Sequence, residues 1–247
     1  MRRLGWVVGF VLVLVACGSK SGGSAAKVGP GSSSTTGAPA GVEKAKPAPG
    51  TGNVQGKVVF DEKPAVGIAV TLCEKFSQYV DGCSGQQYKA QTDSDGVYVI
   101  VNVPPGVYQA LTVAVFDTSN YLFAQSGILT PKTYNITAEK TLFVDTTYLW
   151  KSDLQLVKPD AGSQVSGTNL TLRWNAYPDA TYYMVSVYAS DPGTSSPLPR
   201  QRVAGTTFTL TTSLAAATYR WQVEAYDAQD HKLAASPDNV TFAVVAG

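Results

Sequence analysis

Short runs of alternating apolar and polar residues fill the chain after position 52, and turn-forming residues separate them. The clearest runs cover residues 54–60, 68–73, 97–101 and 107–116. Alternation places every second side chain on one face of a strand, whereas an amphipathic helix repeats its apolar positions about every 3.6 residues. No stretch keeps the helical period over several turns. The pattern therefore predicts an all-β chain of short strands.

Three later segments, 170–174, 182–188 and 219–226, alternate clearly enough to assign their two faces. The inward face consists of Leu170, Leu172, Trp174, Tyr183, Val185, Val187, Tyr219, Trp221, Val223 and Ala225. The opposite face carries Tyr182, Met184, Tyr188 and Tyr226. Aromatic side chains on an outer sheet face can stack on sugars or pack against a protein, but they also favour strands for their own sake. These four residues are the predicted contact face, with strand propensity alone as the alternative.

The N-terminus has the layout of a bacterial export signal over residues 1–16. Two arginines precede an apolar run that is shorter than the roughly 20 residues needed to span a membrane and has the size of a signal-peptide core. The run ends in Leu-Val-Ala-Cys at positions 14–17, which resembles a bacterial lipobox. The resemblance implies cleavage before Cys17, a diacylglycerol on its thiol and acylation, for example by palmitate, of the new amino group. An ordinary secretory signal with a chance cysteine is the alternative.

A lipid on Cys17 implies a location as well as an anchor. Several acyl chains hold a protein to a membrane far better than one. The next residue is Gly18, whereas an aspartate at that position in such lipoproteins signals retention in the inner membrane. The resemblance therefore implies a lipid-anchored protein of the outer membrane in the cell envelope, with its domains facing either the periplasm or the medium.

A flexible linker is predicted over residues 17–52, after the signal peptide. The segment consists mostly of Gly, Ser, Ala, Thr and Pro and contains no aromatic residue. Such a composition cannot bury enough apolar area to offset the entropy lost on ordering, so we expect disorder and a reach of roughly 30 Å. Two tandem β-sandwich domains follow, at 53–151 and 152–247.

The first of these domains carries an ordered set of motifs. They are Val-Gln-Gly-Lys-Val at 54–58, Lys-Pro-Ala-Val-Gly-Ile-Ala-Val-Thr-Leu at 63–72, Thr-Asp-Ser-Asp-Gly-Val-Tyr at 92–98 and Val-Pro-Pro-Gly-Val-Tyr at 103–108. The set resembles the carboxypeptidase regulatory-like domain, a transthyretin-like β-sandwich without catalytic residues. Fold relatives of that domain include starch-binding modules, so the resemblance implies a carbohydrate-binding-like fold, and sugar binding only at the level of the fold class.

The second domain is covered almost completely by another set of motif-bearing segments. They are 156–159, 170–174, 180–188, 219–227 and 240–244. The set resembles a bacterial fibronectin type III domain, an immunoglobulin-like β-sandwich, with Trp174 at the family's core tryptophan. Tyr219 falls at the position of the tyrosine corner, in which a hydroxyl bonds to upstream backbone. Its spacing from Leu214 is shorter than the common pattern.

Cys73 and Cys83 are the only cysteines besides Cys17, and they bracket a polar segment, 74–82, predicted as a loop. In an exported chain the oxidising compartment favours a disulfide between them, and closing so short a loop stabilises a domain by roughly 2–3 kcal/mol. A metal site with two thiolates is the alternative, although the only histidine, His231, lies in the other domain.

Candidate catalytic and metal-binding residues are sparse. Asp93 and Asp95 precede Gly96 as in a calcium loop, but the required glutamate does not follow, so a hairpin turn is favoured. His231 lies in a polar turn, and a single histidine makes a Ser-His-Asp or zinc site hard to assemble. No glycine-rich phosphate loop occurs. We therefore expect no enzyme activity, no metal and no cofactor.

Charge and domain organisation narrow the class of partner. Charged residues make up 15% of the chain and the formal net charge is +1, which argues against nucleic acid. An anchor, a spacer and two binding modules predict a non-enzymatic lipoprotein that presents these modules for protein interaction or envelope scaffolding, with an envelope or surface protein as partner. A carbohydrate-binding lipoprotein, for cell-wall glycan or exopolysaccharide, is the alternative.

Overall fold

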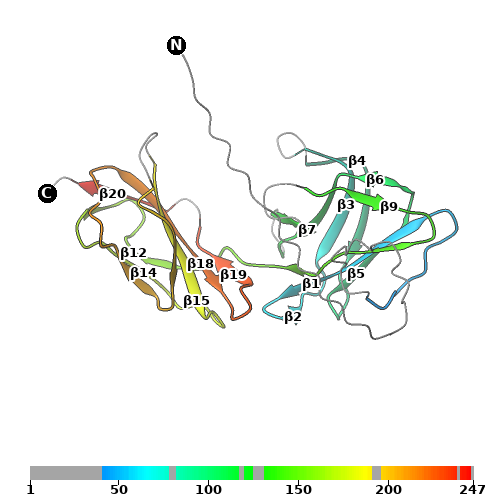
Figure 1. Ribbon diagram of the computed structural model, residues 1–247, viewed down its shortest axis with the longest axis horizontal. Helices are drawn as coiled ribbons and strands as arrows, with labels where there is room; N and C mark the ends of the chain where they lie inside the picture. Colours follow the sequence, from blue (N-terminus) through cyan, green and yellow to red (C-terminus); the bar gives the residue numbers. More distant parts are fainter. Residues whose placement is uncertain are drawn as a thin grey trace, which may run out of the picture. The chain divides into compact units, whose positions relative to one another are not determined.

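The computed structural model describes residues 41–77, 82–116, 120–124, 131–190, 196–237 and 240–245, and these residues are all-β, as predicted (Figure 1). They form two hydrophobic cores, one from residues between 54 and 149 and the other from residues between 154 and 244. The signal peptide, Cys17 and the first part of the predicted linker lie outside the described residues. Among those described, no helix is long and apolar enough to cross a membrane.

The first domain is built around β1 (Gly52–Phe60), which is buried along most of its length. Antiparallel neighbours of β1 are β5 (Val97–Val103) and β2 (Lys63–Pro64), and its parallel neighbours are β10 (Thr141–Phe143) and β11 (Thr147–Tyr148). A second sheet has the order β4 (Gly82–Gln91), β3 (Ala69–Ser77), β7 (Ala110–Ala114) and β8 (Tyr121–Phe123). Alternate residues of both sheets form the core, for example Val54, Leu72 and Leu111.

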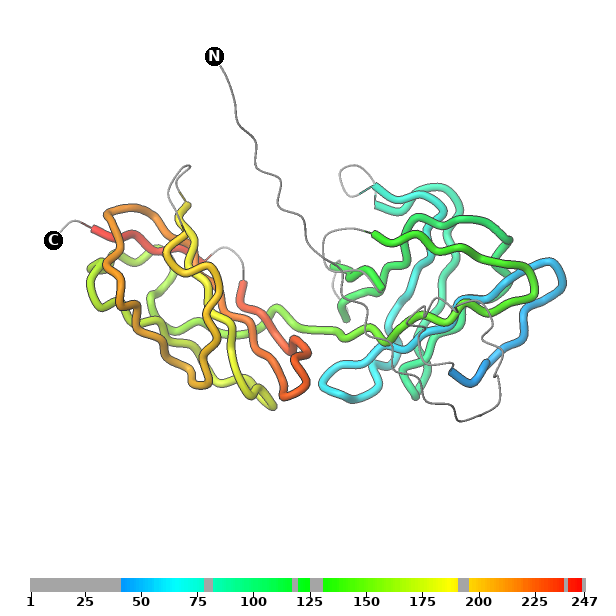
Figure 2. Tube along the Cα trace, in the orientation of Figure 1, coloured from blue at the N-terminus to red at the C-terminus, as the bar shows by residue number. Residues whose placement is uncertain are grey.

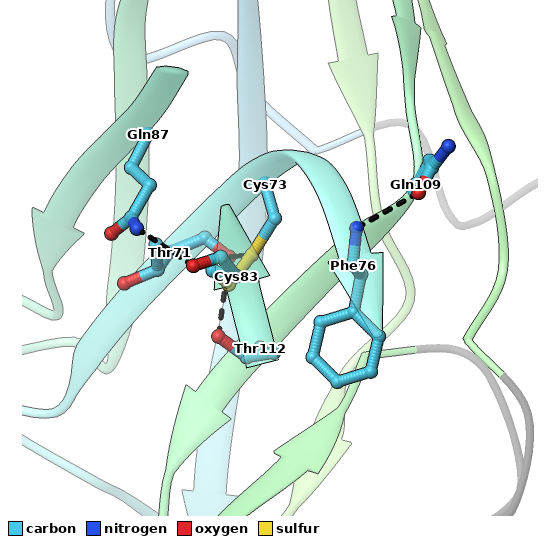
Figure 3. Close-up of a disulfide and its surroundings, with 7 residues drawn as sticks. All are labelled: Thr71, Cys73, Phe76, Cys83, Gln87, Gln109 and Thr112. Carbon is cyan, nitrogen blue, oxygen red and sulfur yellow. Dashed lines mark hydrogen bonds between the residues drawn. A yellow bond between two sulfur atoms is a disulfide. The ribbon is translucent and has the colours of Figure 1, made fainter. Parts of the chain in front are cut away.

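The predicted strand at 107–116 is two strands in the structure. β6 (Gly106–Tyr108) pairs with β9 (Tyr134–Ile136), whereas β7 pairs with β3. Gln109 marks the change of sheet: its amide donates to the Cys73 carbonyl, and its side-chain oxygen accepts a hydrogen bond from the amide of Phe76 (Figure 3). Because the apolar run is continuous, periodicity does not reveal where the chain leaves one sheet for the next.

The segment predicted as a polar loop, 74–82, belongs largely to a hairpin. β3 continues to Ser77, and β4 begins at Gly82 and pairs with it. Most side chains of β4 are polar and at least partly exposed. β4 lies at an edge of its sheet, where polar side chains are tolerated because one backbone edge meets no further strand. The loop prediction was wrong because it relied on apolar alternation, which an edge strand does not require.

Residues 41–46, which composition assigns to the linker, lie against the first domain, and we call this segment the strap. Gln55 of β1 holds it, because its side chain accepts the amide of Lys44 and donates to the carbonyl of Val42, both at 2.8 Å. The side chain of Asn53 donates to another strap carbonyl at 2.9 Å. The chain then doubles back into β1 (Figure 2). The strap thus supplies the partners that two buried polar side chains need.

The second domain packs a small sheet against a large one. The small sheet has the order β12 (Leu156–Lys158), β14 (Thr171–Trp174) and β17 (Thr207–Thr209). The large sheet has the order β13 (Ser163–Ser166), β20 (Thr241–Val245), β18 (Thr218–Tyr226), β15 (Tyr182–Ala189) and β16 (Leu198–Val203), and β19 (Lys232–Ala235) also pairs with β18. All ten residues predicted to face inward are buried in the core.

Tyr219 forms the predicted corner bond. Its hydroxyl donates to the carbonyl of Ala215 at 3.0 Å, and its ring stacks on Phe242. The short spacing from Leu214 therefore does not prevent the bond, because the acceptor lies four residues upstream, just beyond that leucine. The corner fixes the path by which the chain enters β18, the strand that carries much of the candidate site.

Candidate binding face on the second domain

The outer face of the large sheet brings together the four predicted contact residues. Strand register places Tyr182 opposite Tyr226. It places the other two residues beside charged ones, with Met184 between Arg202 and Glu224 and Tyr188 opposite Arg220. Since β15 and β18 pair in continuous register, side chains two residues apart on each strand share one face. We define the outer face as these residues together with Arg200, Asp230 and Lys232.

Tyr182 lies on the outer face and yet is 7% exposed. Its ring stacks on that of Tyr226, with centroids 5.1 Å apart and planes within 8°. The guanidinium of Arg202 lies 3.4 Å from the Tyr182 ring centroid. Cation–π attraction and ring stacking both favour this arrangement. The outer face therefore contains an ordered stack of aromatic rings and a cation in place of an open aromatic platform.

Hydrogen bonds and ion pairs fix the polar ends of the stack. The Tyr182 hydroxyl donates to Asp230 at 2.8 Å. The Tyr226 hydroxyl donates to Glu224 at 3.0 Å and accepts from Arg200 at 2.7 Å. Burial, followed by the neighbouring carboxylate of Glu224, raises the pKa of Tyr226 to about 12. Both phenols are therefore neutral donors at physiological pH, and they hold the two carboxylates in place.

Cations outnumber anions on the outer face. Glu224 forms ion pairs with Arg200 at 3.1 Å and with Lys232 at 3.0 Å, and the Lys232 ammonium also lies 3.8 Å from the ring centroid of Trp150. Arg220 extends the row over Tyr188. The four cations are Arg200, Arg202, Arg220 and Lys232, against the carboxylates Glu224 and Asp230. The charge that remains favours an acidic ligand.

The predicted disulfide is present and lies in the first domain. It joins Cys73 of β3 to Cys83 of β4, whose Cα atoms are 5.3 Å apart, within the usual range for a disulfide (Figure 3). Cys73 is fully buried. The bond ties the polar edge strand β4 to the more buried strand β3. The predicted lipidation site, Cys17, lies outside the described residues.

The two aspartates considered as metal ligands lie in a turn between β4 and β5, but this turn is not the predicted hairpin, because β4 pairs with β3 and β5 pairs with β1 in a separate sheet. One oxygen of Asp93 accepts the amides of Asp95 and Val97, both at 2.9 Å. The ammonium of Lys44, from the strap, lies 2.6 Å from Asp93 and 3.0 Å from Asp95. Hydrogen bonding to Lys44, above all, lowers the pKa of the Asp93 carboxyl. The Lys44 ammonium thus pairs with both of these carboxylates.

Sequence reasoning missed two features that the structure supplies. The three-residue group Glu62, Asp227 and His231 has no spacing that a sequence motif would reveal, because Glu62 lies in the first domain. The arginines of β16 were also missed, although Arg200 and Arg202 alternate on the strand next to the predicted tyrosines. That alternation is the signal that could have found them.

No family model and no curated protein matches the chain. Among solved structures, the fibronectin(III)-like modules of Clostridium thermocellum CbhA match at 17% identity, cover 37% of this chain and 93% of their own, and give a TM-score of 0.28. A putative carbohydrate binding protein from Bacteroides uniformis matches at 11% identity over 78% of this chain and 93% of its own, with a TM-score of 0.27. The FN1–FN3 domains of chicken CNTN1 match at 12% identity over 81% of this chain and 68% of their own, with a TM-score of 0.28. Likenesses this low carry no argument about ligands or partners.

Proposed function

We propose that this chain is an outer-membrane lipoprotein without enzyme activity, anchored through Cys17, that binds an acidic protein partner through the outer face of its second domain. The observation that carries the proposal is the stack of Tyr182, Tyr226 and Arg202, fixed by ion pairs. A rigid surface of tyrosines and arginines suits protein recognition, because these side chains bury much area and lose little conformational freedom on binding.

The domain families belong to the same proposal. Motifs at 54–58, 63–72, 92–98 and 103–108 support a carboxypeptidase regulatory-like first domain. The buried Trp174 and the corner bond of Tyr219 support a fibronectin type III-like second domain. Both families supply binding modules, so the assignments agree with a non-catalytic role.

A protein partner is favoured over a glycan by how the rings are covered. Sugars stack on an open aromatic face. Tyr226 covers one side of the Tyr182 ring, and Arg202 lies over the ring as well. The guanidinium groups of Arg200 and Arg202 stay accessible, with side chains 55% and 63% exposed. Exposed guanidinium groups above one buried ring, that of Tyr182, and one half-buried ring, that of Tyr226, favour carboxylate recognition.

A crosslinking pull-down from intact cells tests the proposed binding face. We expect the wild-type chain to retain one or a few envelope proteins, and the double variant Arg200→Ala/Arg202→Ala to lose them. The matched control is Arg173→Ala, on the exposed face of the other sheet. Equal retention by all three proteins would contradict the proposed face, and failure to capture any protein would contradict the proposed function.

The glycan alternative predicts a different result from the same variants. Retention on cell-wall glycan or exopolysaccharide should then fall when Tyr182 and Tyr188 are each changed to Ala. We expect neither substitution to matter to polysaccharide, because the wild-type chain should not be retained at all. Retention that depends on these tyrosines would replace the protein partner with a carbohydrate.

Protease shaving of intact cells tests on which side of the outer membrane the partner lies. Loss of the second domain, with a periplasmic control protected, would place the partner at the cell surface. Cleavage only after the outer membrane is opened would place it in the periplasm. A chain that fractionates with the cytoplasm would contradict the proposed anchor.

A further inference from the structure

Three ligating side chains, Glu62, Asp227 and His231, converge at a place outside the proposed binding face. The atoms offered by Glu62, Asp227 and His231 lie within 4.8 Å of one another. Nδ1 of His231 is 2.7 Å from an oxygen of Glu62 and 3.3 Å from Oδ2 of Asp227. The sequence predicts a solvated turn residue at His231, whereas its side chain is 27% exposed and its ring stacks on Tyr148.

One oxygen in this group lacks the partner that burial requires. The side chain of Asp227 is 8% exposed, and its Oδ2 accepts no hydrogen bond from any residue that the structure describes. Nδ1 of His231 can carry only one proton, and the shorter contact assigns that proton to Glu62. A buried carboxylate oxygen left without a donor is costly. A cation bound beside Oδ2 of Asp227 would supply the missing partner.

The backbone aims Asp227 and His231 at the same point. Oδ1 of Asp227 accepts the amides of Gln229 and His231, both at 2.8 Å. These bonds close the β18–β19 turn and leave Oδ2 as the oxygen that faces the imidazole. The ring of His231 is held by its stack on Tyr148, with centroids 3.6 Å apart. Two ligand atoms are thus positioned before any ion arrives.

The donor set fits zinc. Zn²⁺ takes imidazole nitrogen and carboxylate oxygen at about 2.0–2.2 Å, and a tetrahedral site places neighbouring ligand atoms roughly 3.3 Å apart. The 3.3 Å between Nδ1 of His231 and Oδ2 of Asp227 agrees with that spacing, whereas the Glu62 oxygen, 2.7 Å from Nδ1, would have to move back when an ion binds. Harder cations such as Ca²⁺ prefer six or more oxygen ligands, and the imidazole argues against them.

We propose that Glu62, Asp227 and His231 form a zinc-binding site that clasps the β1–β2 turn of the first domain to the β18–β19 turn of the second. Zn²⁺ replaces the proton on Nδ1 and gives Oδ2 of Asp227 its missing partner. Three protein ligands leave a fourth position for water. The ion then fixes how the two modules are presented, because the ligands come from both.

The backbone conformation of Glu62 indicates that this residue is present for its carboxylate and not for the stability of the turn. Asp61 and Glu62 form a two-residue turn between the paired residues Phe60 and Lys63, and both have positive φ, of 51° and 57°. Such turns favour Asn and Gly, because other side chains are strained there. A glutamate at this position lowers the stability of the turn and supplies the carboxylate that the site uses.

A single histidine makes the site directly observable. The full chain, purified in detergent with an affinity tag free of histidine and labelled with ¹³C,¹⁵N-histidine, should give one set of imidazole signals. We expect one equivalent of Zn²⁺ to shift the ¹⁵N resonance of Nδ1 strongly and EDTA to reverse that shift. Ca²⁺ should leave the resonance of the metal-free protein unchanged. An imidazole signal that ignores Zn²⁺ would overturn the proposal.

Substitutions at Glu62 separate the clasp from a site on the second domain alone. We expect Glu62→Gln to weaken Zn²⁺ binding by at least about tenfold. Glu62→Gly should weaken it similarly without loss of thermal stability, because glycine relieves the positive φ. The matched control is Glu139→Gln, an exposed glutamate of the same domain. Equal Zn²⁺ affinity in wild type and Glu62→Gln would overturn the clasp.

Discussion

Individual tyrosines in the two domains differ in how their hydroxyls are satisfied. Tyr219 donates to the carbonyl four residues upstream, and Tyr108 does the same to Pro104 at 2.9 Å. The first bond ties the start of β18 to the preceding turn, and the second ties the end of β6 to the residues just before that strand. Tyr98, fully buried in the first core, has a hydroxyl without a partner among the described residues. The same side chain therefore stabilises one position and carries a cost at another.

Removing the corner hydroxyl should weaken the second domain. We expect Tyr219→Phe to lower its free energy of unfolding by about 1 kcal/mol, because the carbonyl of Ala215 loses its donor while the ring keeps its packing. Urea unfolding followed by tryptophan fluorescence measures this, since Trp174 and Trp221 are both buried in that domain. An unchanged midpoint would show that water replaces the bond at no cost.

The buried hydroxyl of Tyr98 should be dispensable. Burial raises the pKa of this phenol well above its ordinary value. Since the folded state resists ionisation, the first domain should lose stability as the pH rises above the unfolded pKa of about 10. Tyr98→Phe should therefore fold with equal or greater stability at neutral pH and lose less of it at alkaline pH. Circular dichroism melts of both proteins across this range test the sign.

The contact between Lys44 and Asp93 should be visible in the titration of the aspartate. The pKa of Asp93 is lowered by Lys44 first and then by backbone amides, so its charged form favours the folded state until acid protonates it. Lys44→Met should raise this pKa partway, because the amides of Asp95 and Val97 still donate. Carboxyl NMR of both proteins measures it, and an identical pKa would mean that the strap does not hold Lys44 there.

At the scale of elements, the disulfide should matter most to the β3–β4 hairpin. We expect the double variant Cys73→Ala/Cys83→Ala to lower the stability of the first domain by roughly 2–3 kcal/mol and to leave the second domain unchanged. The physical reason is that the unfolded chain loses a constraint between residues ten positions apart. Calorimetry should resolve two transitions, and only one should move. A shift in both transitions would mean that the two domains unfold together.

Alternation predicted most of the elements but not their partners. Strands near 54–60, 97–101 and 182–188 were foreseen because their alternate residues enter a core. β4 was missed because a polar edge strand carries no apolar period, and the break at Gln109 was missed because a change of sheet leaves the apolar run intact. Pairing is a long-range property that a local pattern does not encode.

The sequence predicted which residues of the candidate site share one face of the sheet, but it did not predict which of their side chains touch. Alternation placed Tyr182 and Tyr226 on one surface, and strand register confirms that placement. Their function as a contact face stays a prediction. The stack with Arg202 was not foreseeable, because it depends on which strand pairs with β15 and on the direction of a long side chain. Glu62 and His231 meet only through the arrangement of the two domains.

At the scale of the whole molecule, the proposed lipid on Cys17 attaches the protein to the outer membrane. We expect Cys17→Ser to abolish lipid attachment and to release the protein from the outer-membrane fraction, because the variant has no thiol to carry the acyl chains that hold it there. Membrane fractionation with immunodetection measures the change. Persistent membrane association of the variant would mean that a protein partner or an uncleaved signal retains it.

The strap gives the tether a mechanical property. If the lipid is fixed and a bound partner moves away, tension reaches the first domain at the strap, whose few hydrogen bonds to Gln55 and Asn53 would give way before the strands of the core do. Released and fully extended, residues 41–51 would span at most roughly 35–40 Å, so the tether would lengthen by part of that distance without unfolding either sandwich. The strap would thus detach and extend under tension, and it would bind to the first domain again when the tension is removed.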